Sequence, residues 1–464
     1  MDELARIVLN RLPLAEAILL LWNCLAEPAF LQALFHQYRG RCYEKALSFP
    51  VLVQLIADAL LQYAGSARKA FDTADEAGEL PASVQAAYQK LARLPVALSM
   101  ALLARCTQRL RSLWPPVTAV PLPDAFGHLE VVVLDGKAIK RVAKRLKGLR
   151  RARGGLLGGR ALVALALRTG LAVAMHADPD GEANDVRFVP DLLPKVRELV
   201  GGVRLWVADR QFCALVRLAD FVAAWDHFLV RYHGNVSFQR DPARACGTGS
   251  DGEGRRYEEE WGWLGHPQHP QRRYVRRLTL QRPGDTPVIL VTDLVEASRY
   301  PAADLLALYL CRWGIERMFQ QVTEVFGLRG LIGSTPEATV FQFAFCLVLY
   351  NLMQVIRAYV AQAEQRAVET ISTEKVFEDV RRELIAWREV IEPAETVACF
   401  TAVLTVGQVQ ARLQRLLSGV WRDRWLKGPS RKRRPPEQSG KRTHGSVYRI
   451  LEEHRRQQRL RQNE

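Results

Sequence analysis

Two short apolar runs that each end in an aspartate constrain the fold of this chain more than any other feature. Val131-Val132-Val133-Leu134 is followed by Asp135, and the run from Val203 to Ala208 is followed by Asp209. Runs of this kind are typical of strands buried on both faces of a sheet. Ligand sites in such sheets gather at the carboxyl ends of strands, so parallel neighbours would bring both carboxylates to one edge. Taken alone, either aspartate could equally begin a turn or cap the next element.

The segments around these runs predict an α/β unit. Further strands are expected at 161–167, 171–175 and 228–232, and helices at 190–200 and 211–224. Three sequential strands, a helix, a strand, a helix and a strand are the order of an RNase H-like unit. The predicted fold class is therefore α/β, with an RNase H-like mixed sheet flanked by helices.

The rest of the chain predicts a helical N-terminal domain and a β-rich insertion. Helical spacing dominates before the prolines at 115, 116, 121 and 123, and short strands between Gly- and Pro-rich turns are expected after Gly234. The expected segments are a helical N-terminal domain (1–120), the first part of the core (121–233), the β-rich insertion (234–298), the second part of the core (299–360), a helical C-terminal region (361–427) and a basic tail (428–464). In the tail, Pro435-Pro436 and Gly440 favour flexibility up to about Thr443.

The charge balance predicts a polyanionic partner. The chain has 65 Lys and Arg against 49 Asp and Glu, a net charge of +16. Residues 421–464 hold fourteen Lys and Arg against five Asp and Glu, and nine basic residues without an acid lie between Lys137 and Arg153. A solvated charge run is the alternative for the tail. The second run directly follows Asp135 and would repel itself unless phosphates neutralised it, which favours nucleic acid.

Other site classes find little support in the sequence. The eight cysteines include no Cys-x-x-Cys pair, so neither a disulfide framework nor a structural zinc site is predicted. His266 and His269 lack nearby cysteine partners for a metal site. The start of the chain lacks a signal-peptide pattern, and the apolar stretch from Ala338 to Tyr359 carries polar residues typical of a buried core helix. We therefore expect a cytoplasmic, nucleoid-associated protein without membrane contact.

A third carboxylate lies in the segment from Tyr309 to Glu316, which is predicted to form one helix beginning after Pro301. Tyr309, Arg312 and Glu316 then fall within about 60° of arc on one helical face. An arginine can bind a phosphate bidentately, and a carboxylate can complete a metal site. Phosphodiester cleavage uses two Mg²⁺ ions about 3.5–4 Å apart, held by converging carboxylates. A surface helix with a charged stripe is the alternative.

These residues resemble the DDE transposases of bacterial insertion sequences, specifically the insertion-sequence-four family. The family signature is Tyr, two residues, Arg, three residues, Glu, six residues, Lys, and Tyr309, Arg312 and Glu316 match it in spacing. Leu134-Asp135-Gly136 and the segment from Ala208 to Phe212 resemble its first and second Asp motifs. The resemblance runs from about Leu129 to Ala358. At the signature Lys position this sequence has Thr323 instead.

The resemblance implies specific roles for individual residues. Asp135, Asp209 and Glu316 would be the catalytic residues and would hold two Mg²⁺ or Mn²⁺ ions. The residues expected on DNA are Tyr309, Arg312, Arg210, Lys137, Lys140, Trp261 and Trp263. In a hairpin-forming member of the family, the two tryptophans would hold an unstacked base, whereas core packing explains them equally well.

The resemblance also implies an activity and its partners. The chain would be a DNA transposase that binds the inverted-repeat ends of an insertion sequence, with residues 1–120 as a possible end-binding domain. It would cleave and join DNA to a target by a cut-and-paste route, as a homodimer in a synaptic complex. The alternatives are an inactive, repurposed DNA-binding protein and a structure-specific RNase H-like nuclease.

Overall fold

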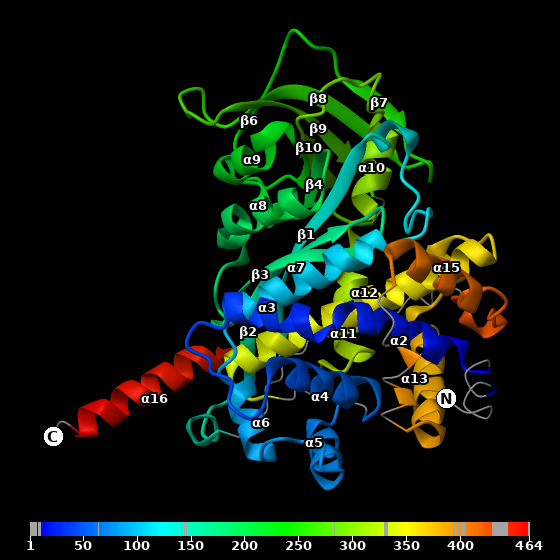
Figure 1. Ribbon diagram of the computed structural model, residues 1–464. Helices are drawn as coiled ribbons and strands as arrows, with labels where there is room; N and C mark the ends of the chain where they lie inside the picture. The colour runs from blue at the N-terminus through cyan, green and yellow to red at the C-terminus, as the bar shows by residue number, and fades with distance from the viewer. Residues whose placement is uncertain are drawn as a thin grey trace.

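The computed structural model describes the chain apart from residues 1–6, 8–10, 64, 141, 143, 145, 283, 329–332, 393–394, 397–398, 401–403, 429–443 and 463–464 (Figure 1). The expected flexibility around Pro435 and Gly440 falls outside these described residues.

The centre of the molecule is a mixed β-sheet whose order begins as the sequence predicts. Its first five strands are β1 (Leu129–Lys140), β2 (Gly155–Ala166), β3 (Leu171–Asp178), β4 (Val203–Ala208) and β5 (His227–Arg231). β1 pairs antiparallel with β2, and β2 with β3, while β4 lies parallel to both β1 and β5. The resulting order 3-2-1-4-5 is that of an RNase H-like sheet, which confirms the predicted fold class.

The β-rich insertion extends this sheet. It contributes β6 (Phe238–Arg240), β7 (Gly247–Ser250), β8 (Arg256–Leu264), β9 (Arg273–Leu280) and β10 (Val288–Thr292). β10 pairs with β5 and β9, and β8 pairs with β9, β6 and β7. Hydrogen bonds therefore run without interruption from the first core strands into the insertion at the top of Figure 1.

Helices cover both faces of the core strands because side chains alternate along each strand. Val132 and Leu134 belong to an apolar cluster with α8 (Val189–Leu199) and α9 (Leu215–Val222). Val131 and Val133 belong to the larger cluster, which includes α11 (Trp313–Glu324) and α12 (Pro336–Ala363). The continuous apolar run that marks β1 in the sequence thus reflects burial on both faces.

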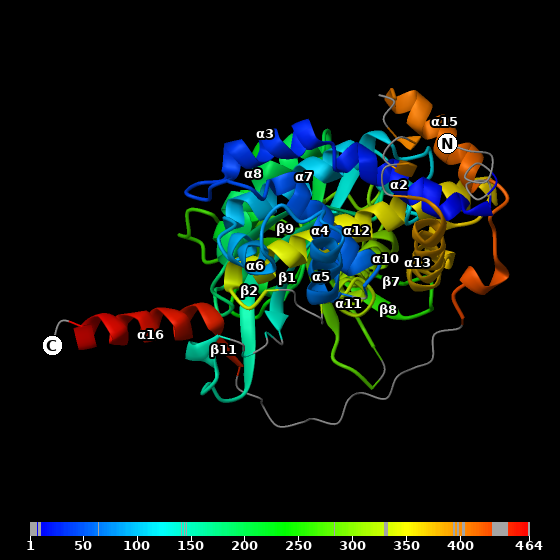
Figure 2. The same ribbon diagram turned by 60° about the horizontal axis from the view of Figure 1, so that its bottom comes forward.

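The N-terminal segment is helical, as predicted. Its helices are α2 (Pro13–Leu25), α3 (Pro28–Tyr38), α4 (Phe49–Leu61), α5 (Ala67–Glu76), α6 (Val84–Leu91) and α7 (Val96–Ser112). Together with α13 (Thr373–Val390) and α15 (Val406–Leu417), several of them surround α12 (Figure 2). Segments from the two ends of the chain therefore share one core.

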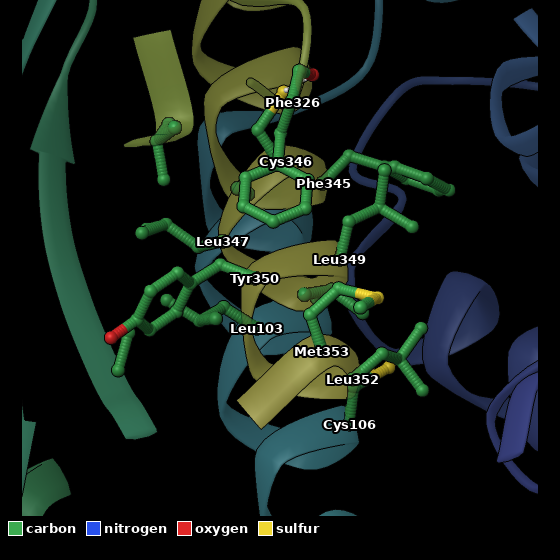
Figure 3. Packing of buried hydrophobic residues seen from close by; sticks show 14 of the residues in the cluster. Leu103, Cys106, Phe326, Phe345, Cys346, Leu347, Leu349, Tyr350, Leu352 and Met353 are labelled. Atoms are coloured by element: carbon green, nitrogen blue, oxygen red, sulfur yellow. Dashed lines mark hydrogen bonds between the residues drawn. The ribbon is translucent and has the colours of Figure 1, made fainter. Parts of the chain in front are cut away.

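Helix α12 is the buried core helix that its polar interruptions predict. By length and apolar composition it would be long enough to cross a membrane, but the qualifying stretch is wholly buried inside the protein. Figure 3 shows Phe345, Leu349 and Met353 of α12 packed among apolar neighbours. Buried Asn351 is satisfied, since its Oδ1 accepts from the Ala172 amide at 2.9 Å and its Nδ2 donates to Thr107 Oγ1 at 2.8 Å.

Three expected elements differ in the structure. The 211–224 helix is shorter, because residues 210–212 and 223–225 form the 3₁₀ turns η4 (Arg210–Phe212) and η5 (Ala223–Trp225) on either side of α9. The helix expected after Pro301 is divided into α10 (Ala302–Leu310) and α11. The end of the basic tail folds into β11 (His444–Ser446) and α16 (Val447–Gln462).

Candidate active site

The register of β1 and β4 brings the first two carboxylates together. Leu134 and Ala208 are partners in the parallel pairing, so Asp135 and Asp209 come next on adjacent strands. The expectation that β1 ends before Asp135 is wrong. β1 continues to Lys140 because its pairing with β2 goes on past the end of β4, and Asp135 lies opposite Val163.

Strand alternation directs both aspartates to the face that carries α11. Val133 and Val207 lie in the larger apolar cluster, and side chains two residues further along a strand point to the same face. Ile315 and Met318 of α11 belong to this cluster as well. The third carboxylate, Glu316, therefore approaches the sheet from the side to which Asp135 and Asp209 point.

The Tyr309 to Glu316 segment is not one continuous helix. The amides of Cys311 and Arg312 donate to the carbonyls of Leu308 and Tyr309 at 3.0 Å, which is a 3₁₀ turn between α10 and α11. Tyr309 ends α10, Arg312 precedes α11, and Glu316 lies in the first turn of α11. Since the turn keeps right-handed helical backbone angles, it preserves the convergence of the three side chains.

Arg312 connects the carboxylates. Its Nη1 lies 3.0 Å from Glu316 Oε1 and 3.9 Å from Asp135 Oδ2, and the side chain is 6% exposed. Burial disfavours its charged form, but Tyr309, Asp209, Glu316 and Asp135 raise the pKa of the guanidinium. Its buried Nε has no hydrogen-bond partner in the described part of the chain and so retains an unused donor.

Burial perturbs the titration of the groups beside Arg312. It raises the pKa of Asp135 to about 6. The Gly136 amide and Arg312 lower this pKa, while like-charge repulsion from Glu316 and Asp209 raises it further. Burial also raises the pKa of Tyr309 to about 12. Among the residues that the structure describes, the buried Tyr309 hydroxyl and Asp209 Oδ1 have no hydrogen-bond partners. Such unsatisfied atoms and shifted carboxylates are concentrated at functional sites.

The donor set fits a hard divalent cation in its chemistry. Three carboxylates supply the oxygen ligands that Mg²⁺ and Mn²⁺ take, and Asp209 Oδ1 is a buried oxygen with no competing donor. Within the described part of the chain, however, no three His, Cys, Asp or Glu side chains are gathered at metal-ligand distances. Arg312 lies between Asp135 and Glu316 and balances their charge, so binding an ion there requires the guanidinium to move.

Two candidate DNA contacts lie next to the aspartates. Arg210 directly follows Asp209 and is exposed, while Lys137 lies two residues after Asp135, with its ammonium 5.4 Å from the centre of the Phe319 ring. Lys140 ends β1. All three are on the strands or turns that carry the catalytic candidates.

The two tryptophans of the insertion are remote from the carboxylates. Both lie on β8, five strands from β1 in the sheet order, which is about 24 Å at about 4.8 Å per strand. Trp261 is buried, and its Nε1 donates to the Val295 carbonyl at 2.9 Å. Trp263 is 39% exposed, with the Arg272 guanidinium 4.5 Å from its ring centre. This placement favours core packing for Trp261 over the base-holding role.

Thr323 is engaged within its own helix. Its hydroxyl donates to the Phe319 carbonyl at 2.7 Å, so it offers neither a charge nor a free donor at the position of the signature lysine. His266 and His269 are exposed in the turn between β8 and β9.

The sequence analysis did not predict an ion pair between Arg160 and Asp185, which lies next to Gly136. Asp185 is buried, and its Oδ2 accepts from Arg160 Nη2 at 2.9 Å. A Cβ atom on Gly136 would lie 1.5 Å from this oxygen, so only glycine fits after Asp135. The one sequence signal was the Asp135-Gly136 pair itself, because nothing local to Asp185 links it to β1.

Comparisons with known proteins agree with this geometry. Residues 127–352 match the family "Transposase DDE domain", a span that contains Asp135, Asp209 and Glu316. The chain is 32% identical over 82 residues to "Putative transposase y4zB" of Sinorhizobium fredii (strain NBRC 101917 / NGR234), covering 18% of this chain and 22% of that protein. The match thus spans less than a quarter of the relative's length.

A solved structure of a transposase is only distantly similar. The cryo-EM structure of the piggyBac transposase synaptic complex with hairpin DNA aligns with 92% of this chain and 79% of its own, at 10% identity and a TM-score of 0.35. A TM-score this low adds nothing to the fold assignment, which comes from the strand order. Residues 127–352 are therefore similar to the transposase DDE domain, and they contain the RNase H-like strand order described above.

Proposed function

We propose that this protein is a DNA transposase that cleaves and joins DNA in a metal-dependent reaction at Asp135, Asp209 and Glu316. The observation that carries the proposal is the convergence of these carboxylates with Arg312 and Tyr309 on one face of the RNase H-like sheet. The match to the DDE domain over the same residues supports it.

Each residue would have a defined task in this reaction. The three carboxylates would hold Mg²⁺ or Mn²⁺, which supply activation of the attacking oxygen and stabilisation of the leaving oxygen when bound. Arg312 would transfer its guanidinium from Glu316 to a DNA phosphate, with the free Nε as a further donor. The unpartnered Tyr309 hydroxyl would donate to a phosphate oxygen.

The proposed substrates are the inverted-repeat ends of an insertion sequence and a target DNA. A cut-and-paste route requires two ends to be held at once, so we propose a homodimer in a synaptic complex. Nucleoid association in the cytoplasm follows from this partner. We also propose the segment boundaries 1–120, 121–233, 234–298, 299–360, 361–427 and 428–464, with DNA-end binding by residues 1–120.

Thr323 favours a second candidate, a repurposed protein that binds DNA without cutting it. The hydroxyl is used by the helix backbone and cannot replace the charge of a lysine. A structure-specific nuclease on the same fold would cut branched DNA but never join ends.

Nicking of a supercoiled plasmid that carries the element's own ends tests these possibilities. Wild-type protein with Mg²⁺ or Mn²⁺ is compared with Glu316→Gln and with the matched control Glu324→Gln, an exposed residue on the same helix. We expect 3′-hydroxyl nicks from wild type and control, and none from Glu316→Gln. Equal products from Glu316→Gln would remove this residue from the mechanism, and tight binding without cleavage would establish the binding protein.

A further inference from the structure

We propose that α16 and the basic loop after β1 form one arm that binds the backbone of duplex DNA beside the active site. The arm comprises residues 144, 146–154 and 444–462. Packing and charge define the arm. Duplex DNA as its partner rests on the proposed function.

The two parts of the arm are joined by pairing and packing. β11 pairs parallel with the start of β2, with His444 opposite Gly155 and Ser446 opposite Leu157. α16 follows at once and packs on η2 (Lys147–Leu149). The contact is close, because a Cβ atom on Gly148 would lie 3.3 Å from both His454 and Leu451.

Specific bonds fix the base of the arm. Arg449 contacts Asp180 and Glu182 at 2.8 Å each, and the Ser446 amide donates to Glu182 at 2.9 Å. The acids near the base are thereby already paired. Beyond this base, α16 extends away from the rest of the molecule in both Figure 1 and Figure 2.

The outer surface of the arm is strongly basic. Its exposed cationic residues are Lys144, Lys147, Arg150, Arg151, Arg153, Arg455, Arg456, Arg459 and Arg461. The acids on the same helix are Glu452, which pairs with Arg455 at 2.9 Å, and Glu453. Such a cluster repels itself until phosphates neutralise it.

A solvated helix with a charged surface is the simpler interpretation of α16. The outer half of α16, however, has few packing contacts that would stabilise it. Val447 is its one fully buried residue among those described, and short helices without packing are marginal in water. Phosphate partners for the arginines would stabilise this outer half of α16. A helix that is only solvated has no such source of stability.

The position of the arm relative to Asp135 favours DNA over another polyanion. β1 carries Asp135 and continues to Lys140, and these five residue steps span about 17 Å in an extended strand. At about 3.4 Å per base pair, this reach corresponds to about five base pairs. A duplex with its scissile phosphate at Asp135 would therefore meet the arm about 5–10 base pairs away.

Salt-dependent binding tests the arm without using catalysis. A duplex of about three helical turns is titrated by fluorescence anisotropy in EDTA between about 50 and 200 mM salt. The test variant is Arg456→Gln/Arg459→Gln/Arg461→Gln. The control removes three positive charges elsewhere, with Arg382→Gln and Arg388→Gln on α13 and Arg415→Gln on α15. We expect the slope of log K against log salt to fall by about 2–3 in the test variant and by less than 1 in the control.

An unchanged slope, or an equal fall in the control, would overturn the proposal. A change in oligomeric state with an unchanged slope would also overturn it, and would assign α16 to contact with a second copy. Circular dichroism checks that the variants fold. If DNA binding depends on the arm but the wild type shows no metal-dependent nicking, the proposed function fails and the arm stands. If the wild type nicks DNA but the salt slope does not depend on the arm, the arm fails and the proposed function stands.

Discussion

Arg312 holds the charges of the candidate site in balance. Its guanidinium touches Glu316 and faces Asp135, and it is nearly inaccessible to water. Arg can bridge two groups with a planar fork, whereas Lys offers a single point charge. The apolar runs before Asp135 and Asp209 and the spacing of Tyr309, Arg312 and Glu316 could be recognised in the sequence. The bridging position of Arg312 could not, because it depends on side-chain packing between elements distant in sequence.

Arg312→Lys is expected to lower the single-turnover nicking rate by about 10²–10³-fold, because a donor to the reacting phosphate is lost while the charge remains. DNA binding in EDTA should change little. The control is Arg317→Lys, an exposed arginine on α11. A nicking rate equal to wild type in Arg312→Lys would contradict the role given to this side chain.

The raised pKa of Asp135, about 6 against the ordinary 3.8, predicts a pH-dependent stability. The folded protein binds this proton more tightly than the unfolded chain, so stability falls as pH rises from about 4 to about 6. At pH 7 the free energy of unfolding of Asp135→Asn, measured by denaturant titration, should therefore exceed that of the wild type by up to about 2 kcal/mol. Near pH 4 the two values should be equal. A wild-type advantage at pH 7 would show that Arg312 outweighs burial.

Gly136→Ala is expected to destabilise the protein by about 2–4 kcal/mol, because its Cβ would collide with Asp185. In a double-mutant cycle, Gly136→Ala combined with Asp185→Ala should cost less than the sum of the two single changes. Urea unfolding measures all four proteins. Strict additivity would mean that the two positions do not touch.

Among the elements, the paired strands β1 and β4 were the most predictable and the turn between α10 and α11 the least. Buried parallel strands have a distinctive apolar pattern, so both strands could be located in the sequence, although the end of β1 could not. The 3₁₀ turn at Cys311 and Arg312 differs from an α-helix only by one residue in its hydrogen bonding, and no proline marks it. β11 was also missed, since three residues leave no periodic pattern.

Thr323→Lys tests whether α11 tolerates the signature residue. The threonine hydroxyl donates to the Phe319 carbonyl of its own helix, so the change should alter the free energy of unfolding by less than about 0.5 kcal/mol. One added phosphate contact should tighten DNA binding and raise the salt slope by about 1. Binding no tighter than that of the wild type would show that this end of α11 does not face DNA.

On the scale of the whole molecule, the first described helix depends on a residue near the other end of the chain. No described side chain near α2 caps it, and Glu383 of α13 instead accepts from the Leu14 and Ala15 amides at 2.8 and 3.2 Å. Arg412 of α15 also pairs with Glu16 at 2.6 Å. Such long-range capping cannot be inferred from sequence, because the cap lies 369 residues away.

Glu383→Ala should lower the free energy of unfolding by about 1–2 kcal/mol, since two buried amides lose their acceptor. Glu374→Ala, an exposed position on α13, is the matched control. Chemical denaturation followed by tryptophan fluorescence measures both. Equal midpoints for the two variants would show that Glu383 does not cap α2 in solution.

This capping has a consequence in time. At about 5–20 residues per second, a ribosome needs roughly 20–70 s to proceed from Leu14 to Glu383. Throughout that interval the Leu14 and Ala15 amides lack the Glu383 acceptor, so α2 can reach its final packing only after α13 has been made. A product that stops before α13 would keep all three candidate catalytic carboxylates and still lack the residue that caps α2.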